Sequence, residues 1–393
     1  MAKIHDRLMK KANAGRIPLT GVFELSPLCN FSCKMCYVRR TAAQVSEAGG
    51  LRPLSFWLDA AQQAADAGCL LPLISGGEPF LYPGFRKLYE AMRRMGMQVS
   101  INTNGSLIDE ETVAWLRERP PVRINITLYG GSREAYGRLC GNPGAFDRVM
   151  HAAQLLNEAG LNYHFNCSLT PDNEQDFDAI LDAAKQCGRS IRMATYMFPP
   201  LRSAGVIGDY PDRFTPEKSA YYEVLLNYRQ GTREEFLRGA RKAESYVELT
   251  DEILRKAASG PPGEMRCMAG RSSFWLDWQG NLSRCGVNTL PKFSLDEHPF
   301  AEAWDRIVSA TNEFRYCSVC ENCPNRGLCF VCAAMVYNET GSFDERPIYI
   351  CERTRYAAKW YRHFLEQLPE EDEPASSGKP TEQPGPECPV DEF

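Results

Sequence analysis

Three cysteines stand within one short loop near the start of the chain. Cys29, Cys33 and Cys36 are spaced CxxxCxxC in the segment 29–37, CNFSCKMCY. Thiolates are soft ligands that select zinc, copper(I) or iron–sulfur clusters. Three of them leave a metal centre one protein ligand short, and an incomplete ligand set keeps a coordination position open for chemistry. A structural zinc site or a redox-active cysteine pair is the alternative that this motif alone leaves open.

A larger set of cysteines lies in the C-terminal part of the chain. The sequence has 16 cysteines, and those between 267 and 351 are Cys267, Cys285, Cys317, Cys320, Cys323, Cys329, Cys332 and Cys351. Paired cysteines of the CxxC kind also hold zinc in zinc ribbons, which is the alternative for this segment. Four scattered cysteines in apolar or helical surroundings are interpreted as small core residues: Cys69, Cys140, Cys167 and Cys187.

The composition is that of a globular protein. The 393 residues carry a net charge of −5, and no stripe of Lys and Arg indicates a nucleic-acid surface. The N-terminus lacks the apolar core of a secretory signal, and no apolar run reaches the roughly 18 residues of a membrane span. We therefore expect a cytoplasmic protein without nucleic-acid or membrane partners. Because thiols stay reduced in the cytoplasm, the clustered cysteines indicate metal binding rather than disulfides.

Short apolar runs alternate with helical patterns from residue 20 to about 230. The runs predict strands at 20–25, 71–75, 97–102, 122–129, 161–169 and 190–197. Six strand–helix units joined by short turns imply a parallel sheet with helices outside. A closed barrel needs eight units, so the prediction is an α/β fold with a partial, open (β/α)6 TIM-like barrel. The polar, Gly-rich and Cys-rich segments all follow strands, which predicts a site at the C-terminal strand ends.

The sequence patterns also divide the chain into segments. We expect an N-terminal extension at 1–19, the barrel at 20–202, a helical bridge at 203–262, a cysteine-rich domain at 263–352 and a C-terminal helix at 353–368. The remaining segment, 369–393, is acidic and rich in Pro and Ser. It has too few apolar groups to compensate the entropy of ordering, so it is predicted to be disordered.

Four segments that follow predicted strands resemble the signatures of radical SAM enzymes. After the cysteine loop come SGGEP at 75–79, NTNGS at 102–106 and ITLYGGSREAYGRLCG at 126–141. The resemblance implies that Cys29, Cys33 and Cys36 bind three irons of a 4Fe–4S cluster. The fourth iron would chelate S-adenosyl-L-methionine, and one electron from the reduced cluster would release methionine and a 5′-deoxyadenosyl radical.

The resemblance also implies which residues contact that cofactor. They are Tyr37, Gly76, Gly77, Glu78, Pro79, Asn104, Thr127 and Arg138. Tyr37 stands at the family's aromatic position near the adenine, and the GGE residues would receive the methionyl ammonium. Asn104 has a simpler interpretation as part of an Asn-Gly turn. Tyr129 replaces the family's usual Asp, which leaves the substrate side of the fourth strand undefined.

The C-terminal cysteines are similar to the SPASM extension of radical SAM enzymes. By this resemblance, a distal auxiliary 4Fe–4S cluster is bound by Cys320, Cys323, Cys329 and Cys351, and a proximal one by Cys267, Cys285 and Cys332. Two departures from the pattern are the spacing of Cys329 and Cys332 and the additional Cys317. Cys317 is either the fourth ligand of the proximal cluster or no ligand, in which case that cluster has an open iron.

The resulting hypothesis is a radical SAM/SPASM enzyme that oxidatively modifies a ribosomal peptide or protein, for example by a thioether or carbon–carbon cross-link. Its partners would be the precursor peptide, an external electron donor of the flavodoxin or ferredoxin type, and a separate peptide-recognition partner. The alternatives are a radical SAM dehydrogenase of a small molecule, a formylglycine-forming sulfatase maturase and a non-catalytic iron–sulfur electron carrier. Gly286 stands where formylglycine maturases have Asp, which counts against the maturase.

Overall fold

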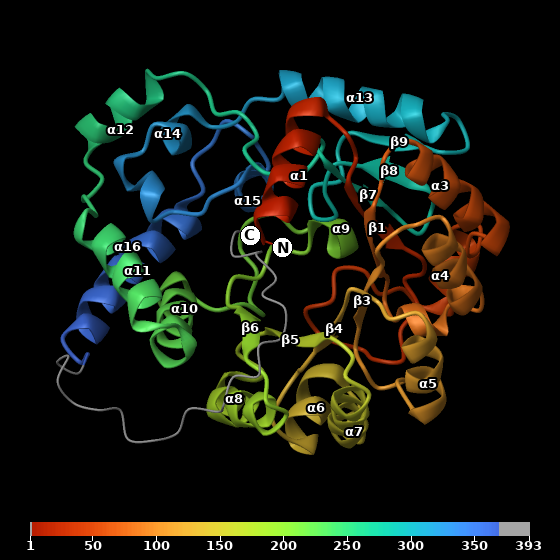
Figure 1. Cartoon of the computed structure of the whole chain (residues 1–393). Coiled ribbons are helices and arrows are strands. Elements are labelled where there is room, and N and C mark those ends of the chain that lie inside the picture. Colours follow the sequence, from red (N-terminus) through yellow and green to blue (C-terminus); the bar gives the residue numbers. More distant parts are fainter. Residues whose placement is uncertain (1, 369–393) are drawn as a thin grey trace.

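A computed structural model describes residues 2–368 of the chain, with a nine-stranded sheet at its centre (Figure 1). Six parallel strands follow one another in chain order, and the sixth lies at one edge of the sheet. The sheet is not closed, which confirms the predicted partial barrel of the α/β class. These strands are β1 Thr20–Glu24, β2 Leu71–Ser75, β3 Ser100–Thr103, β4 Arg123–Thr127, β5 Tyr163–Ser168 and β6 Ile191–Ala194.

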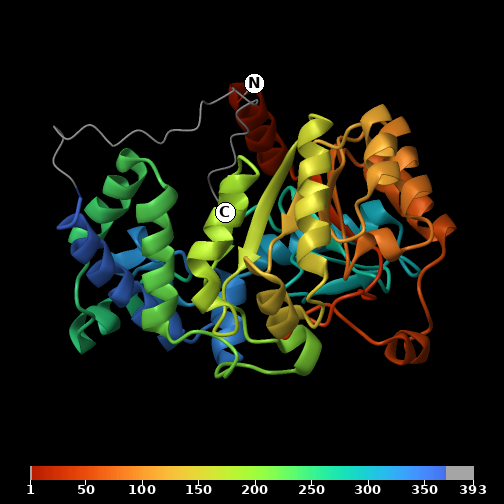
Figure 2. The ribbon, with the colours of Figure 1, turned by 90° about the horizontal axis from the view of Figure 1, so that it is seen from below.

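Helices cover the outer face of these strands (Figures 1 and 2). They are α3 Leu54–Asp66, α4 Phe85–Arg94, α5 Glu110–Glu118, α6 Arg133–Cys140, α7 Ala145–Glu158 and α8 Phe177–Gln186. In β5 the alternate residues Tyr163 and Phe165 are fully buried in the main core, whereas Asn166 and Ser168 are only half-buried. Because successive side chains of a strand point to opposite faces, the inner face is left for polar groups.

The C-terminal cysteine-rich segment continues the same sheet on the other side of β1. The strand β7 Ser273–Leu276 pairs in parallel with β1, and β8 Asn281–Ser283 and β9 Lys292–Ser294 follow in antiparallel order. Gly21 permits this pairing, because a Cβ at that position would lie 2.0 Å from the Phe274 ring. The segment predicted at 263–352 and the barrel therefore share one sheet.

Helices form a second packed unit beside the sheet (Figure 2). Its members are α10 Pro216–Gln230 and α11 Arg233–Glu244 from the predicted bridge, together with α16 Ile348–Leu365. Their common core consists of Ala220, Val224, Phe236, Ala240, Ala243, Ala357, Ala358, Tyr361 and Phe364, with Leu328 beside them. The helix α16 begins at Ile348, directly after Pro347, and not at 353 as predicted. Cys351 consequently lies in its first turn.

The other helices connect these units. They are α1 Ala2–Gly15, α2 Ala42–Glu47, α9 Leu201–Ala204, α12 Asp251–Ala258, α13 Phe300–Glu313, α14 Ser318–Glu321 and α15 Ala333–Thr340, with the 3₁₀ turns Pro79–Leu81, Glu174–Asp176 and Pro324–Gly327. Within residues 2–368 no helix is long and apolar enough to cross a membrane. The tail predicted to be disordered, 369–393, lies outside the described residues.

Candidate active site

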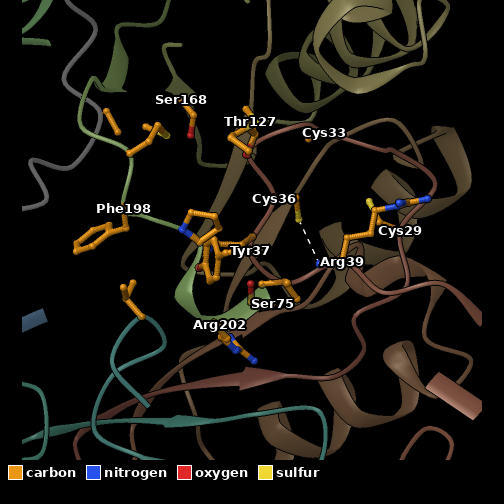
Figure 3. A pocket seen from close by; sticks show the side chains of 18 of the residues that line it. Cys29, Cys33, Cys36, Tyr37, Arg39, Ser75, Thr127, Ser168, Phe198 and Arg202 are labelled. Atoms are coloured by element: carbon orange, nitrogen blue, oxygen red, sulfur yellow. Dashed lines mark hydrogen bonds between the residues drawn. The ribbon is translucent and has the colours of Figure 1, made fainter. Parts of the chain in front are cut away.

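A cavity of about 430 Å³ opens where the barrel strands end. The thiols of Cys29, Cys33 and Cys36 line it, and Figure 3 shows Cys36 and Tyr37 beside the polar strand residues. The strands contribute Ser75, Asn102, Thr103, Asn125, Thr127, Asn166, Ser168 and Ala194. The segment after β6 contributes Tyr196, Met197, Phe198, Pro199, Pro200, Leu201 and Arg202. One side of the cavity is therefore polar and uncharged, and the other is largely apolar.

The cysteine loop is held by backbone hydrogen bonds. Ser32 N donates to Cys140 O over 3.0 Å, which fastens the loop to the end of α6. Two backbone amides point at thiols: Phe31 N lies 3.4 Å from Cys29 Sγ, and Arg39 N lies 3.3 Å from Cys36 Sγ. Amide donors of this kind stabilise a thiolate and keep its sulfur directed into the cavity.

Burial disfavours the ionised form of the thiols on the cysteine loop. Burial raises the pKa of Cys29 to about 12 and also raises the pKa of Cys36, in both cases against opposing backbone hydrogen bonds. A metal removes this penalty, since a coordinating thiol is deprotonated outright. Three soft donors on one loop, all lining one cavity, fit an iron–sulfur cluster with one iron left for another ligand.

The two glycines of the GGEP segment are required by the cysteine loop itself. Gly77 N donates to Ser26 O over 2.7 Å, and Glu78 N donates to Leu28 O over 2.9 Å. A Cβ at Gly76 would lie 2.6 Å from Ser26 O, and one at Gly77 would lie 2.4 Å from Leu28 O. Both glycines line the cavity. Their small size thus lets β2 and the cysteine loop meet there.

Glu78 is fully buried, and its side chain is directed to the end of β3. The carboxylate accepts hydrogen bonds from Asn104 N at 2.8 Å, Thr103 Oγ1 at 2.8 Å and Phe80 N at 3.2 Å. Burial raises the pKa of Glu78 to about 7, although these hydrogen bonds oppose the shift. Neither Glu78 nor the buried Pro79 belongs to the lining of the cavity, unlike the glycines before them.

Asn104 lies where it could contact the cofactor and also forms part of a turn, the two roles considered for it in the sequence. It lines the cavity, and its amide also builds a turn, with Nδ2 donating to Asn30 Oδ1 at 2.8 Å and Oδ1 accepting from Ser106 N at 2.9 Å. Thr127, at the end of β4, lines the cavity as well. Arg138 does not: it pairs with Asp176, which directly precedes α8.

A buried ion pair that the sequence did not predict lies at one side of the cavity. Arg202 Nη2 lies 2.6 Å from Glu24 Oε1, and Trp275 Nε1 donates to Glu24 Oε2 over 3.0 Å. The Glu24 side chain has no exposed surface, and burial raises its pKa against the opposing effect of Arg202. The signal for Glu24 was a carboxylate ending an otherwise apolar strand, TGVFE. Nothing near Arg202 in the sequence indicates its partner.

The C-terminal cysteines lie in two neighbourhoods. Burial raises the pKa of Cys332 to about 11, and Cys285 and Cys267 raise it further. Burial likewise raises the pKa of Cys351 to about 11, with Cys329 and Cys323 among its charged neighbours. We name Cys267, Cys285 and Cys332 the proximal thiols, and Cys320, Cys323, Cys329 and Cys351 the distal thiols.

Cys317, the additional cysteine, lies with the distal thiols. The Cys320 thiol lowers the pKa of Cys317, and Cys317, burial, Cys351 and Cys329 all raise the pKa of Cys320. The proximal thiols lie nearer the cavity, because Cys285 stands two residues before Val287, which lines it; both Cys36 and Cys285 also raise the pKa of Tyr37. Within residues 2–368 no three His, Cys, Asp or Glu side chains lie close enough to hold a single metal ion.

Comparisons with known proteins agree with this arrangement. Residues 23–184 match the family model described as "Radical SAM superfamily". The chain is 24% identical to an AdoMet-dependent heme synthase of Methanosarcina barkeri over 84% of this chain and 95% of that protein. It is 26% identical to the subtilosin biosynthesis protein AlbA of Bacillus subtilis over 84% of this chain and 70% of that protein.

A solved structure shows the same fold. SuiB of Streptococcus suis, crystallised with its precursor peptide SuiA, matches 89% of this chain and 79% of its own, with a TM-score of 0.61 and 20% identity. The matched domain, the relatives and the cysteine pattern lead to one family. Residues 23–184 form a radical SAM domain, and the cysteine-rich C-terminal region resembles the SPASM extension.

Proposed function

We propose that this enzyme uses S-adenosylmethionine to abstract a hydrogen atom from a side chain of a ribosomal peptide or protein, and that the product is an oxidised, cross-linked peptide. Cys29, Cys33 and Cys36 would hold the 4Fe–4S cluster, with Gly76 and Gly77 beside the bound cofactor. When bound, the cluster and S-adenosylmethionine supply one-electron cleavage of a carbon–sulfur bond and hence the 5′-deoxyadenosyl radical.

The observation that carries the proposal is the apolar wall facing the three thiols. Met197, Phe198 and Leu201 come from one continuous segment after β6, and Val287 adds to them from beside the proximal thiols. An apolar wall binds the side chain of a peptide and excludes water from the reacting atoms. Water exclusion matters here because it prevents side reactions of a reactive intermediate.

The position of Cys317 supports cross-linking through a substrate thiol. With Cys317 beside Cys320, the proximal group keeps three thiols, Cys267, Cys285 and Cys332. A cluster held by three thiols has one position for a further ligand. A cysteine of the substrate fits that position, and the proximal group lies next to Val287 in the cavity wall. A thioether is therefore the cross-link that we favour.

Formylglycine formation has less support. Asp277 is the carboxylate nearest in sequence to Cys285, yet its Oδ1 accepts hydrogen bonds from Gln279 N and Asn281 N, both at 3.0 Å. These are the bonds of a turn residue between β7 and β8. The carboxylate is thus occupied in holding the hairpin.

A small-molecule substrate is the second candidate. It is favoured by the relatives named AdoMet-dependent heme synthases, which align over most of this chain. A substrate with several carboxylates would need several cations in the cavity wall. Arg39 and Arg202 are the arginines in the lining, and Arg202 is paired with Glu24. This charge distribution favours the peptide.

The deciding experiment is anaerobic reconstitution with iron and sulfide, followed by reduction in the presence of S-adenosylmethionine. We expect about twelve irons per chain, as three 4Fe–4S clusters require, and release of 5′-deoxyadenosine. The triple substitution of Cys29, Cys33 and Cys36 by Ala should abolish that release, whereas Cys69→Ala, which changes a buried core cysteine, should not. Cleavage by the triple variant, or zinc in place of iron, would contradict the proposal.

The substrate class is tested with the same preparation. A Cys-containing precursor peptide should lose the mass of two hydrogens when its cross-link forms, as measured by mass spectrometry. An iron porphyrin with propionate side chains serves as the competing substrate. Decarboxylation of the porphyrin without any change of the peptide would establish the second candidate instead.

A further inference from the structure

The lining of the cavity carries little charge. Its charged side chains are those of Arg39 and Arg202, and it contains no Asp or Glu among the residues that the structure describes. Arg202 is neutralised by Glu24, whose Oε1 lies 2.6 Å from Nη2 of the arginine. The guanidinium of Arg39 has no hydrogen bond or ion pair to any residue in 2–368. The cavity therefore keeps one positive charge that no carboxylate of the described chain compensates.

The backbone of Arg39 is fixed, although the residue is exposed. Its amide donates to Cys36 Sγ over 3.3 Å, and its carbonyl accepts from Arg40 Nη1 over 3.0 Å. The next amide, that of Arg40, donates to Pro27 O over 3.1 Å. The guanidinium of Arg39 thus extends from a rigid base at the cavity.

Arg39 and the apolar wall lie on opposite sides of the cavity. Figure 3 shows Arg39 on the side of Cys29 and Cys36, whereas Phe198 lies on the other side. A ligand that fills the cavity therefore meets apolar side chains on one side and a single cation, close to the thiols, on the other.

The chemical partner of such a cation is a carboxylate. A guanidinium presents its N–H donors in a planar fork that matches the two oxygens of a carboxylate, and such charge-assisted hydrogen bonds are stronger than neutral ones. One cation matches one carboxylate, whereas a ligand with several carboxylates would bring charges that the lining does not compensate. In a peptide, the side chain of an Asp or Glu supplies one carboxylate near the residue that reacts.

We propose that Arg39 is a specificity-determining residue that binds one carboxylate of the substrate peptide, from an Asp or Glu close to the residue that loses its hydrogen atom. The inference rests on the proposed function, because it takes the substrate to be a peptide bound in this cavity. Arg39 breaks no bond itself; it holds the peptide in register with the reacting atoms. Because its guanidinium is exposed, the pair should contribute modestly to affinity and should weaken as the salt concentration rises.

The test measures peptide binding to the reconstituted enzyme with S-adenosylmethionine present, by anaerobic fluorescence anisotropy. The probes are the labelled peptide acetyl-Glu-Ala-Cys-Ala-Glu-amide and its analogues with Gln or Lys in place of both Glu residues. The unmodified enzyme should bind the Glu peptide about fivefold more tightly than the Gln peptide, the upper range for an exposed ion pair. Arg39→Gln should bind the two equally, and Arg39→Glu should prefer the Lys peptide. Lys34→Gln is the matched control and should keep the preference for Glu, since Lys34 is on the same loop but pairs with Asp172 outside the lining.

Three outcomes would contradict these expectations. A preference for the Glu peptide that persists in Arg39→Gln, or that is absent from the unmodified enzyme, would overturn the inference. Weaker binding of S-adenosylmethionine to Arg39→Gln, with the order of the peptides unchanged, would assign the guanidinium to the cofactor and overturn it as well. Binding of none of the three peptides to the unmodified enzyme would instead count against a peptide substrate, and hence against the proposed function.

Discussion

The cysteine loop of the barrel and the cysteines of the C-terminal region are assembled in different ways. The loop takes its three thiols from residues 29–36, and hydrogen bonds to the end of α6 and to the GGEP segment hold it in place. The proximal thiols come from three separate places: Cys267 before β7, Cys285 after β8 and Cys332 at the start of α15. The first site is thus local in sequence, and the second depends on the pairing of distant elements.

This difference predicts how each site should respond to amino-acid substitutions. A local loop fails when its own residues change. A site assembled from distant elements also fails when the packing that joins those elements is disturbed. The sheet joins the two sites, because β7 pairs with β1 and Glu24 at the end of β1 contacts both Arg202 and Trp275.

The largest expected effect is a loss of 5′-deoxyadenosine formation that follows substitution in the cysteine loop but not among the distal thiols. Cys33→Ala should lower 5′-deoxyadenosine formation by at least about a hundredfold, because an incomplete ligand set loses the cluster on which cleavage depends. Cys323→Ala should lower the iron content but leave most of the cleavage, because Cys323 belongs to the distal thiols. Iron analysis and product chromatography on both variants measure the contrast. Equal loss of cleavage in both would show that the two sites do not function separately.

The second effect concerns the ion pair that joins the two sites. Arg202→Met should lower the free energy of unfolding by about 3–5 kcal/mol, because it leaves the buried Glu24 carboxylate without its cation. Arg138→Met is the matched control on a more exposed pair with Asp176, where about 0–1 kcal/mol is expected. Denaturant unfolding of the reconstituted protein measures both. Similar losses in the two variants would remove the special role of the Glu24–Arg202 pair.

The third effect is a pH dependence confined to the barrel site. Burial raises the pKa of Glu78 to about 7, so the folded protein keeps a proton that the unfolded chain releases near its ordinary value of 4.5. Stability should therefore fall as pH rises from about 4.5 to 7, by about 3 kcal/mol for this group, and should change no further above that range.

The variant Glu78→Gln isolates that contribution. It cannot ionise, so its stability relative to the unmodified chain should increase between pH 5 and 7. Denaturant unfolding at several pH values measures this difference. A constant difference across the range would mean that Glu78 does not titrate there.

The smallest effect tests the grouping of the C-terminal thiols. Cys317→Ala should leave the iron content unchanged, since Cys317 lies beside Cys320 and the distal thiols already number four. Its cost in stability should be about 1 kcal/mol, as for other small truncations in a core. Iron analysis is the measurement. Loss of about four irons per chain would identify Cys317 as a cluster ligand and close the proximal site.

Local sequence patterns predicted much of the fold and part of the candidate site. Apolar runs such as LPLIS ended in turn-forming residues and predicted β2 and its GGEP turn. The spacing of Cys29, Cys33 and Cys36 indicated one loop with three donors. These features depend on residues within a few positions of one another, where periodicity and turn chemistry are readable.

Other features required contacts between distant segments. Arg138 matches a cofactor-contact position in sequence, yet it pairs with Asp176 outside the cavity. Glu24 and Arg202 are 178 residues apart and form a buried pair. The start of α16 at Ile348 was missed because its first turn carries the isolated Cys351 rather than a clear helical repeat.

The sequence by itself determined that a three-thiol loop stands at the mouth of a parallel, open barrel and that many further thiols follow it. Only the tertiary structure decided that β7 joins the barrel sheet, that Cys317 lies with the distal thiols, and that Glu24 pairs with Arg202. The physical reason is the range of the interactions. Turns and periodic burial act between near neighbours, whereas sheet pairing and side-chain contacts depend on where the whole chain brings distant residues together.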